Sequence, residues 1–247
     1  MVCSHGNGGR VKEWLEKFII MEDIHINDVT LSYSMLTIIG PQAESFMFDI
    51  LKIKSLKSNS SISYSNEKES CFIYHDEQWT IPAYNVITKA GKASLLLSEC
   101  AEKISLIGVD TSEILRIEQG IPKYNVDFSE QINPLEAGFE KFISSLKGCY
   151  IGQEVIARLD TYKKLQKKLT GFIFEDTNLH HISSGKVFQN NIEVGWITSQ
   201  TWSFNLKRLI ALGFLKTSIT ESEFIIDTGN GRFKVHCHWL PFLSDVN

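Results

Sequence analysis

The sequence lacks the cysteine pairing that would predict a disulfide framework or a cysteine-only zinc site. The cysteines are odd in number, no Cys-x-x-Cys pair occurs, and the five residues are spread over the whole chain: Cys3, Cys71, Cys100, Cys149 and Cys237. Such scattered thiols form no evident set of four ligands, so we do not expect the chain to hold a [4Fe–4S] cluster by itself.

Proline and glycine are also scarce, and long apolar runs are absent. The content of 5 prolines, 16 glycines and 43% hydrophobic residues excludes collagen-like and disordered chains. The longest apolar run, residues 209–215, is far shorter than the roughly 20 residues that a membrane span needs. The first ten residues are polar and lack the apolar core of a secretory signal. We therefore expect a cytoplasmic protein without a membrane partner.

Strong charge of either sign is missing as well. The formal net charge is -4, from 25 basic and 29 acidic residues. This balance argues against a broad nucleic-acid-binding surface but leaves room for a local basic patch. At 247 residues the chain has the length of one large domain or two modest ones, at roughly 100–200 residues per domain.

Hydrophobic spacing predicts alternating helices and strands in the first hundred residues. Apolar positions three and four apart predict a helix with one buried stripe over residues 11–20. The next expected elements are a strand at 31–39, a helix at 41–51, an exposed loop at 52–70 with a short strand near 62–64, strands at 71–75 and 84–88, and a helix at 92–104. This order resembles a split β-α-β unit of the ferredoxin-like type.

The pattern changes after residue 105. Residues 110–113 (Asp-Thr-Ser-Glu) form an N-cap signature, and Gly120 and Pro122 end the short helix that follows. Short strands with turn signals between them are expected at 168–174, 186–188, 192–198, 208–215, 224–226 and 232–240. This spacing predicts a small antiparallel barrel or sandwich. We therefore expect an α+β chain in three parts: residues 1–105, 106–163 and 164–247.

The most distinctive segment is Lys-Gly-Cys-Tyr-Ile-Gly-Gln-Glu at residues 147–154. Residues 153–159 have helical spacing, so Cys149 lies just before a helix N-terminus, where unpaired N–H groups favour the thiolate. Lys147 and Arg158 would add to that positive field. In the alternative interpretation, the two glycines only permit a tight turn, and Cys149 packs as a small apolar residue.

A second cluster combines residues 116–122 (Arg-Ile-Glu-Gln-Gly-Ile-Pro) with residues 133–138 (Asn-Pro-Leu-Glu-Ala-Gly). Glu136 follows a proline turn, and a carboxylate there can accept two parallel hydrogen bonds from an amidine-like heterocycle such as a pterin. Alternatively, Arg116 and Glu118 are ordinary helix-surface charges and Glu136 caps a helix. The residues alone favour this second interpretation.

Basic residues and histidines give weaker signals. Four closely spaced lysines could meet a phosphate backbone or a polyanionic tail, although the solvated start of a strand explains most of them: Lys163, Lys164, Lys167 and Lys168. The two imidazoles of residues 236–238 (His-Cys-His) share one strand face. No third ligand is evident nearby, and the His-His pair at 180–181 lies in a loop, so we expect no metal site.

Residues 147–154, with Ala157 and Arg158 after them, resemble the signature of the YgfZ-type folate-binding proteins. These proteins belong to the same superfamily as the glycine-cleavage T-protein (GcvT), an aminomethyltransferase. Further blocks resemble the family in the same order, between residues 11 and 242: residues 18–29, 116–122, 133–138, 164–172, 195–215 and 240–242. The T-protein tends to carry Asp and Arg where this chain has Cys149 and Gln153, which favours the YgfZ side.

The resemblance implies a three-part architecture that closes around tetrahydrofolate or a derivative, with a C-terminal β-barrel. In the T-protein a glutamate that matches Glu136 holds the pterin, and an arginine that matches Lys164 lies near the folate. The resemblance also implies a functional thiol at Cys149 as the candidate catalytic group. Four further folate contacts are expected on the same basis: Arg116, Tyr124, Gln153 and Arg158.

YgfZ-type proteins are associated with the maintenance of iron–sulfur enzymes, including those of tRNA methylthiolation, in a folate-dependent way. The resemblance therefore implies a folate-binding accessory protein whose partners are iron–sulfur enzymes or their assembly factors, without direct nucleic-acid binding. Two alternatives stay open. One is an aminomethyltransferase of the glycine cleavage system, and the other is an interaction module whose folate pocket is vestigial.

Two departures from the family pattern bear on activity. The chain begins at a block that family members reach only after about 80 residues, roughly half a typical domain. We expect that this segment, which carries the T-protein's catalytic aspartate, is missing, and this favours a non-catalytic protein over an active transferase. Lys164 also replaces the T-protein arginine, so a side chain that can form two parallel hydrogen bonds is replaced by one that acts as a point charge.

Overall fold

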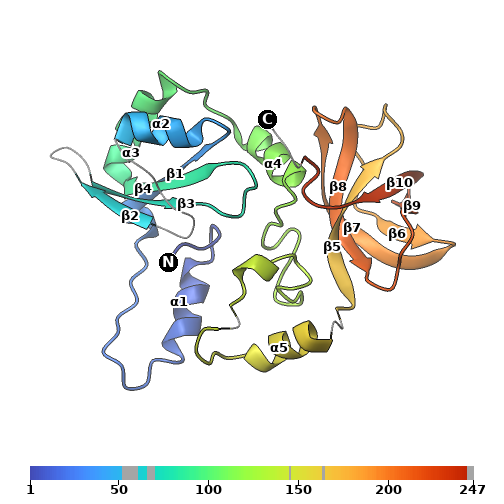
Figure 1. Cartoon of the computed structure of the whole chain (residues 1–247), viewed down its shortest axis with the longest axis horizontal. Helices are drawn as coiled ribbons and strands as arrows, with labels where there is room; N and C mark the ends of the chain where they lie inside the picture. Colours follow the sequence, from blue (N-terminus) through green and yellow to red (C-terminus); the bar gives the residue numbers. More distant parts are fainter. Residues whose placement is uncertain (52–60, 66–69, 145, 163–164, 244–247) are drawn as a thin grey trace. The chain divides into compact units, whose positions relative to one another are not determined.

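The computed structural model describes residues 1–51, 61–65, 70–144, 146–162 and 165–243 (Figure 1). The chain divides into two compact units, Met1–Leu106 and Ile107–Asp245. In the described part of the chain, no helix is both long and apolar enough to cross a lipid bilayer. Lys163 and Lys164 lie outside the described residues, as does the expected boundary between them.

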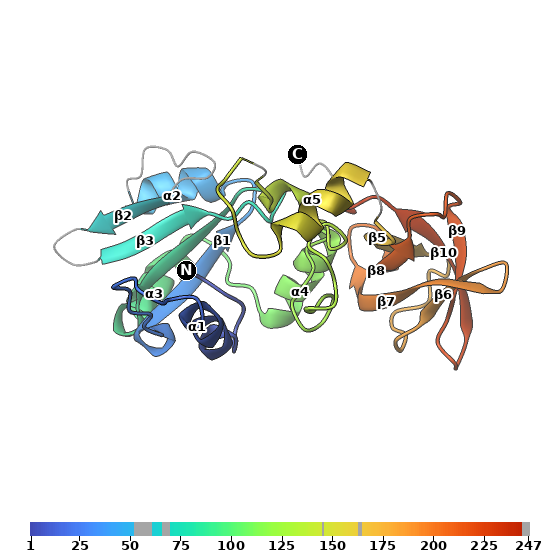
Figure 2. The same cartoon turned by 90° about the horizontal axis from the view of Figure 1, so that it is seen from below.

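The first unit contains a four-stranded antiparallel sheet with two helices on one face (Figures 1 and 2). Its strands are β1 (Tyr33–Ile39), β2 (Ser61–Ser65), β3 (Ser70–His75) and β4 (Ala83–Lys89), in the spatial order β1-β4-β3-β2. The helices are α2 (Ala43–Leu51) and α3 (Ala90–Ala101). Because side chains alternate between the two faces of a strand, every second residue faces the helices. The resulting core includes Ile38, Met47, Ile73, Val86 and Leu96.

The helix expected at residues 11–20 forms at α1 (Gly8–Glu16), and none of its residues is buried. Trp14 is 56% exposed, and its ring lies edge-on to that of Phe18, with centroids 5.4 Å apart. The prediction of a buried stripe is therefore wrong. Apolar spacing shows that a helix has an apolar face, but not that another element covers it. The following strand begins at Tyr33, after a 3-10 turn, η1 (Thr30–Ser32).

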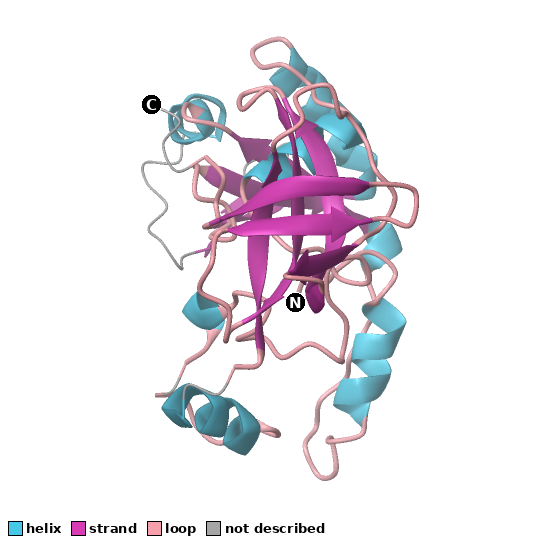
Figure 3. Ribbon diagram, turned by 90° about the vertical axis from the view of Figure 1, so that its right-hand side faces the viewer, coloured by secondary structure: helices cyan, strands magenta, loops and turns pink. Residues whose placement is uncertain are grey.

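The second unit contains a closed, six-stranded antiparallel barrel (Figures 1 and 3). Its strands, in the spatial order β10-β5-β8-β7-β6-β9, are β5 (Lys167–Phe174), β6 (Lys186–Gln189), β7 (Ile192–Ser203), β8 (Arg208–Lys216), β9 (Glu223–Asp227) and β10 (Arg232–His238). Asn190 and Asn191, with φ of 49° and 62°, form the two-residue turn between β6 and β7, as primed hairpin turns require. The predicted α+β chain with a C-terminal antiparallel barrel is confirmed.

Strand β8 is buried on both faces, which explains its uninterrupted apolar sequence. One set of side chains fills the barrel interior together with Phe172 of β5: Leu209, Ala211 and Leu215. The alternate set lies on the outside of the barrel and packs against Ile117 of α4 (Val109–Glu118) and Phe242: Ile210, Leu212 and Phe214. Helix α4 and the barrel therefore share one outer core.

Helix α4 begins one residue after Gly108, which is its N-cap in place of the expected Asp110. Asp110 lies in the first turn, where a carboxylate still interacts favourably with the exposed N–H groups. At the other end Gly120 has φ of 69°, and the N–H groups of Gly120 and Ile121 donate to the carbonyls of Ile117 and Arg116. This Schellman motif needs a residue in the left-handed conformation, and Gly120, the predicted end of the helix, adopts it.

Two further elements lie between α4 and β5 in the sequence. They are the 3-10 turn η2 (Glu140–Phe142) and helix α5 (Gln153–Tyr162). The cysteine-containing segment at residues 147–154 leads directly into α5, so a helix begins at Gln153, the position that the spacing predicts.

Candidate functional site

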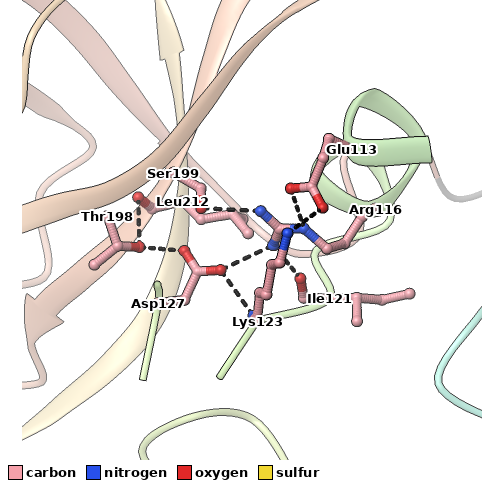
Figure 4. Close-up of polar contacts among 8 residues, drawn as sticks. All are labelled: Glu113, Arg116, Ile121, Lys123, Asp127, Thr198, Ser199 and Leu212. Carbon is pink, nitrogen blue, oxygen red and sulfur yellow. Dashed lines mark hydrogen bonds and ion pairs between the residues drawn. The ribbon is translucent and has the colours of Figure 1, made fainter. Parts of the chain in front are cut away.

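A buried polar network joins helix α4 to barrel strand β7 (Figure 4). Arg116 of α4 is 8% exposed, and its guanidinium donates to Asp127 Oδ2 at 2.8 Å and to the Ile121 carbonyl at 2.6 Å. It also donates to Ser199 Oγ of β7 at 3.0 Å and, through Nε, to Glu113 Oε2 at 3.0 Å. Four of the five N–H groups of a guanidinium are thus used within the protein.

Asp127 is the anionic centre of this network, and its side chain is fully buried. Besides Arg116, it accepts hydrogen bonds from the backbone N–H of Lys123 at 2.8 Å and from the hydroxyl of Thr198 (Figure 4). A carboxylate that loses its water needs such compensation, because an unpaired buried charge is very costly. The network therefore fixes the loop after α4 against the barrel.

Glu113 completes the network at its solvent-exposed edge. Burial acts to raise the pKa of the Glu113 carboxyl, but the hydrogen bonds and positive charges of Lys123 and Arg116 outweigh it, and the pKa lies below its usual value. The Lys123 Nζ to Glu113 Oε1 distance is 2.7 Å, and the side chains are 48% and 35% exposed. Solvent screens such a pair, so its contribution to stability is small beside that of Asp127.

Glu118, at the end of α4, is also buried, with 2% exposure. The Ser203 hydroxyl donates to its Oε1 at 2.5 Å, and the Asn205 amide lies 3.5 Å from its Oε2. The interpretation of Arg116 and Glu118 as ordinary surface charges is therefore wrong. Both are residues of α4 that bond to side chains of strand β7, and the folate contact expected of Arg116 stays a prediction.

Glu136 lies in a turn that is fixed to the start of β5. Its carbonyl accepts the Leu169 N–H at 2.8 Å, and its carboxylate Oε2 accepts the Asn133 N–H at 3.3 Å. Lys167 Nζ is 3.8 Å from the same oxygen, and the Glu136 side chain is 13% exposed. Among the described residues, Oε1 has no hydrogen-bond partner. Glu136 caps a turn and not a helix, and it keeps acceptor capacity for a ligand.

Cys149 is exposed, so the interpretation in which it packs as a small apolar residue is wrong. Nearby, Gly152 has φ of 86°, and the tight turn before α5 uses it. Gln153 Oε1 accepts the Tyr150 N–H at 3.2 Å, and Lys147 Nζ lies 4.3 Å from the centre of the Tyr150 ring. Within the described part of the chain, the Cys149 thiol has no hydrogen-bond partner.

The other predicted site residues have separate partners in the described part of the chain. Tyr124 is half-buried, with its ring 5.6 Å from that of Phe128, and Arg158 is exposed on α5. Lys164 lies outside the described residues. In the described ranges, no hydrogen bond or ion pair joins Glu136 to the other predicted contacts, so their shared role stays a prediction: Cys149, Tyr124, Gln153 and Arg158.

The histidines of β10 have other partners. His236 Nε2 is 3.0 Å from Glu175 Oε1, and the His238 ring stacks on Phe242 with centroids 5.5 Å apart. Among the described residues, no group of three or more His, Cys, Asp or Glu side chains is arranged to hold a metal ion.

The partners of Arg116 and Glu118 have no recognisable signal in the sequence. Asp127 lies in a turn-like stretch, and Ser199 and Ser203 occupy ordinary positions of an expected strand. No local signal distinguishes them, because the residues they contact are 11 to 85 positions away in the chain. Only the packing of α4 against β7 makes them partners.

Two family models match the chain. Residues 1–147 match the model described as the GCVT N-terminal domain. The chain belongs to the glycine cleavage T-protein (GCVT) family. Residues 167–243, which begin with β5 and extend past β10, match the glycine cleavage T-protein C-terminal barrel domain. The superfamily that the sequence resembles is thereby confirmed.

Relatives in this family are distant and longer. The chain is 26% identical to an aminomethyltransferase of Thermoanaerobacter pseudethanolicus, over 90% of this chain and 62% of the relative. It is 27% identical to an aminomethyltransferase of Aquifex aeolicus, over 85% and 55%. It is also 29% identical to a putative chloroplastic transferase of Arabidopsis thaliana, over 83% and 48%. The chain thus spans less than two thirds of the length of these relatives.

A solved structure supports the fold. The glycine cleavage system aminomethyltransferase T of Bartonella henselae superposes with a TM-score of 0.81, over 97% of this chain and 67% of that one. The identity is 17%, so the likeness concerns the fold alone.

Proposed function

We propose that this GCVT-family chain binds tetrahydrofolate or a derivative, with the Glu136 carboxylate as the group that holds the pterin. The proposal rests on the exposure and the hydrogen-bond contacts of that carboxylate. It is largely withdrawn from water, its Oε1 is unpaired among the described residues, and its Oε2 has only long contacts of 3.3 and 3.8 Å. A pterin presents two parallel N–H donors, which a carboxylate in this state can accept together.

Glu136→Gln is expected to weaken tetrahydrofolate binding at least about tenfold, because an amide replaces one charged acceptor by a donor that opposes the pterin N–H. Isothermal titration of tetrahydrofolate against the wild type and the variant measures this change. Glu140→Gln is the matched control, since Glu140 is a nearby carboxylate that is 46% exposed and pairs with Lys168. Equal affinities of the wild type and Glu136→Gln, or no binding by either, would show that Glu136 does not hold folate.

We further propose that the folate-bound protein acts as a cytoplasmic accessory factor for iron–sulfur enzymes, as the YgfZ-type resemblance implies, with Cys149 as the functional thiol. Support comes from the motif at residues 147–154 and from the exposure of Cys149, which leaves the thiol open to a partner. The other expected contacts, Arg116, Tyr124, Gln153, Arg158 and Lys164, belong to the same proposal.

Cys149→Ser is expected to fold like the wild type, because the exposed hydroxyl is close in size to the thiol, yet to lose the accessory function. Complementation of a strain that lacks its YgfZ-type protein measures that function through the activity of an iron–sulfur enzyme, and thermal unfolding verifies the fold. Cys3→Ser, at another exposed cysteine, is the control and should complement fully. Full complementation by Cys149→Ser would exclude a thiol role.

The second candidate function is aminomethyl transfer to tetrahydrofolate, because two of the relatives described above are aminomethyltransferases. Incubation of the full chain with an aminomethyl-lipoyl carrier protein and tetrahydrofolate distinguishes the two functions. Release of ammonia with formation of methylenetetrahydrofolate would favour the transferase over the accessory factor.

A further inference from the structure

Two lysines are directly opposed on neighbouring barrel strands. Lys167, the first residue of β5, and Lys216, the last residue of β8, are cross-strand partners. Directly opposed residues of an antiparallel pair point to the same face, and like charges at such positions destabilise a sheet. The pair therefore places two positive charges on one face of the barrel, where an anion would relieve their repulsion.

Both lysines line one surface cavity in the second unit. Its volume is about 260 Å³, and its other lining residues are Gln166, Glu193, Val194, Gly195 and Trp196. The volume lies just below the range of about 300–1,000 Å³ that is common for ligand pockets, so the cavity suits a small molecule. Lys167 also lies 3.8 Å from Glu136, whereas Lys216 and Trp196 are not among the proposed folate contacts.

The indole of Trp196 positions one of the two ammonium groups. Its ring stacks on the buried Phe214, with centroids 5.3 Å apart and an interplanar angle of 28°. Lys167 Nζ lies 5.3 Å from the centre of the Trp196 ring, a distance at which the ring attracts a cation. Trp196 is 37% exposed, so it also offers apolar surface to a ligand.

The charges around the cavity leave one positive charge uncompensated. Lys167 Nζ is 3.8 Å from Glu136 Oε2, and Glu193 pairs with Lys186 at 2.7 Å. Lys216 Nζ donates to the carbonyl of Glu193 at 3.0 Å, and within the described residues no carboxylate lies in ion-pair range of it. Two lysines and one glutamate line the cavity, and their ion-pair neighbours add one lysine and one glutamate, which leaves one excess positive charge.

We propose that this cavity binds the carboxylate of a small organic acid. The carboxylate lies between the ammonium groups of Lys167 and Lys216, and the apolar body of the acid contacts Trp196 and Val194. A carboxylate carries one negative charge and balances the excess of one, whereas a phosphate group with a charge of about -1.5 to -2 would exceed it. Gln166 supplies a neutral amide donor for the second carboxylate oxygen.

Benzoate, an aromatic monocarboxylate, is the probe, and neutral benzamide is its matched control. We expect benzoate to change tryptophan fluorescence and to raise the melting temperature of the full chain. Trp196→Phe should lose the fluorescence change while keeping the thermal shift, and benzamide should produce neither. The proposal is overturned if the wild type does not respond to benzoate, or if benzamide acts equally well.

Lys216→Met tests the second ammonium group. It is expected to bind benzoate at least about tenfold more weakly than the wild type. Without benzoate, its melting temperature should equal or exceed that of the wild type, because the opposed like charges are gone. Lys234→Met, at an exposed position of β10, is the control and should bind benzoate normally. Undiminished binding by Lys216→Met would contradict the proposal.

The acid is separate from the folate of the proposed function. Lys167 Nζ is 3.8 Å from Glu136, the proposed pterin acceptor, and a rigid p-aminobenzoyl group keeps the glutamate tail of the same folate away from its pterin. Lys216→Met should therefore bind tetrahydrofolate like the wild type, and weaker binding would contradict a separate acid. The cavity proposal does not rest on the folate proposal. Benzoate binding without tetrahydrofolate binding would overturn only the folate proposal, and the reverse result would overturn only the cavity.

Discussion

Replacement of Asp127 by alanine is expected to lower the free energy of unfolding by about 3–5 kcal/mol. The change removes the buried carboxylate that pairs with Arg116 at 2.8 Å and accepts the Lys123 N–H and the Thr198 hydroxyl. A guanidinium with 10% side-chain exposure then loses its fully buried counter-charge and keeps only Glu113, which is 35% exposed. The Lys123 N–H and the Thr198 hydroxyl also lose their carboxylate acceptor. Urea unfolding followed by circular dichroism measures the loss.

A double-mutant cycle separates the pair from its surroundings. When Arg116→Met is combined with Asp127→Ala, the loss should be smaller than the sum of the two single losses by at least about 1 kcal/mol, since neither charge is then left unpaired. Glu223→Ala, at an exposed position of β9, is the control and should change stability by less than about 0.5 kcal/mol. A loss below about 1 kcal/mol for Asp127→Ala would show that the network is not as tightly closed as its distances imply.

Gly213→Ala is expected to cost at least about 3 kcal/mol, or to prevent folding of the barrel. A Cβ at this position of β8 would lie 2.2 Å from the Trp196 carbonyl oxygen and 2.9 Å from Ile197 Cα. Both are backbone atoms of the paired strand β7, so the contact cannot be relieved by a side-chain rotation. The clash would have to separate two strands that are hydrogen-bonded along most of their length.

Gly91→Ala is the matched control for this prediction. Gly91 lies in the first turn of α3, and a Cβ there meets no atom within 4 Å. Because alanine restricts the unfolded chain more than glycine does, this variant should be neutral or up to about 1 kcal/mol more stable. Thermal unfolding of both variants compares them directly. A melting temperature of Gly213→Ala equal to that of the wild type would refute the close approach of β7 and β8.

The parts of the fold that could be predicted are those with a local physical cause. Asn190 and Asn191 tolerate positive φ, so the turn between β6 and β7 could be recognised in the sequence. Gly120 ends α4 for the same kind of reason, because the left-handed stop needs it. The barrel strands followed from the regular distances between such turns.

The parts that could not be predicted depend on contacts between distant segments. Arg116 and Glu118 are charged residues of a predicted helix, which favours an exposed position, and only their contacts with Ser199 and Ser203 of β7 show that they are buried. The apolar stripe that includes Trp14 led to the opposite error, since its side chains were expected to be buried and no residue of α1 is buried. In the candidate site, Glu136 could be identified by the proline turn before it. The role of its neighbour Lys167 could not be predicted, because it depends on the strand register that places Lys167 opposite Lys216.

The two-sided burial of β8 determines where the chain can be divided. A piece that starts at β5 would close its barrel but would lose Ile117 of α4 from the outer core, so Ile210, Leu212 and Phe214 would be less covered and only Phe242 and other residues of the piece would pack on them. An exposed apolar patch of this kind promotes self-association. The smallest piece of this chain that keeps both cores covered therefore begins ahead of α4.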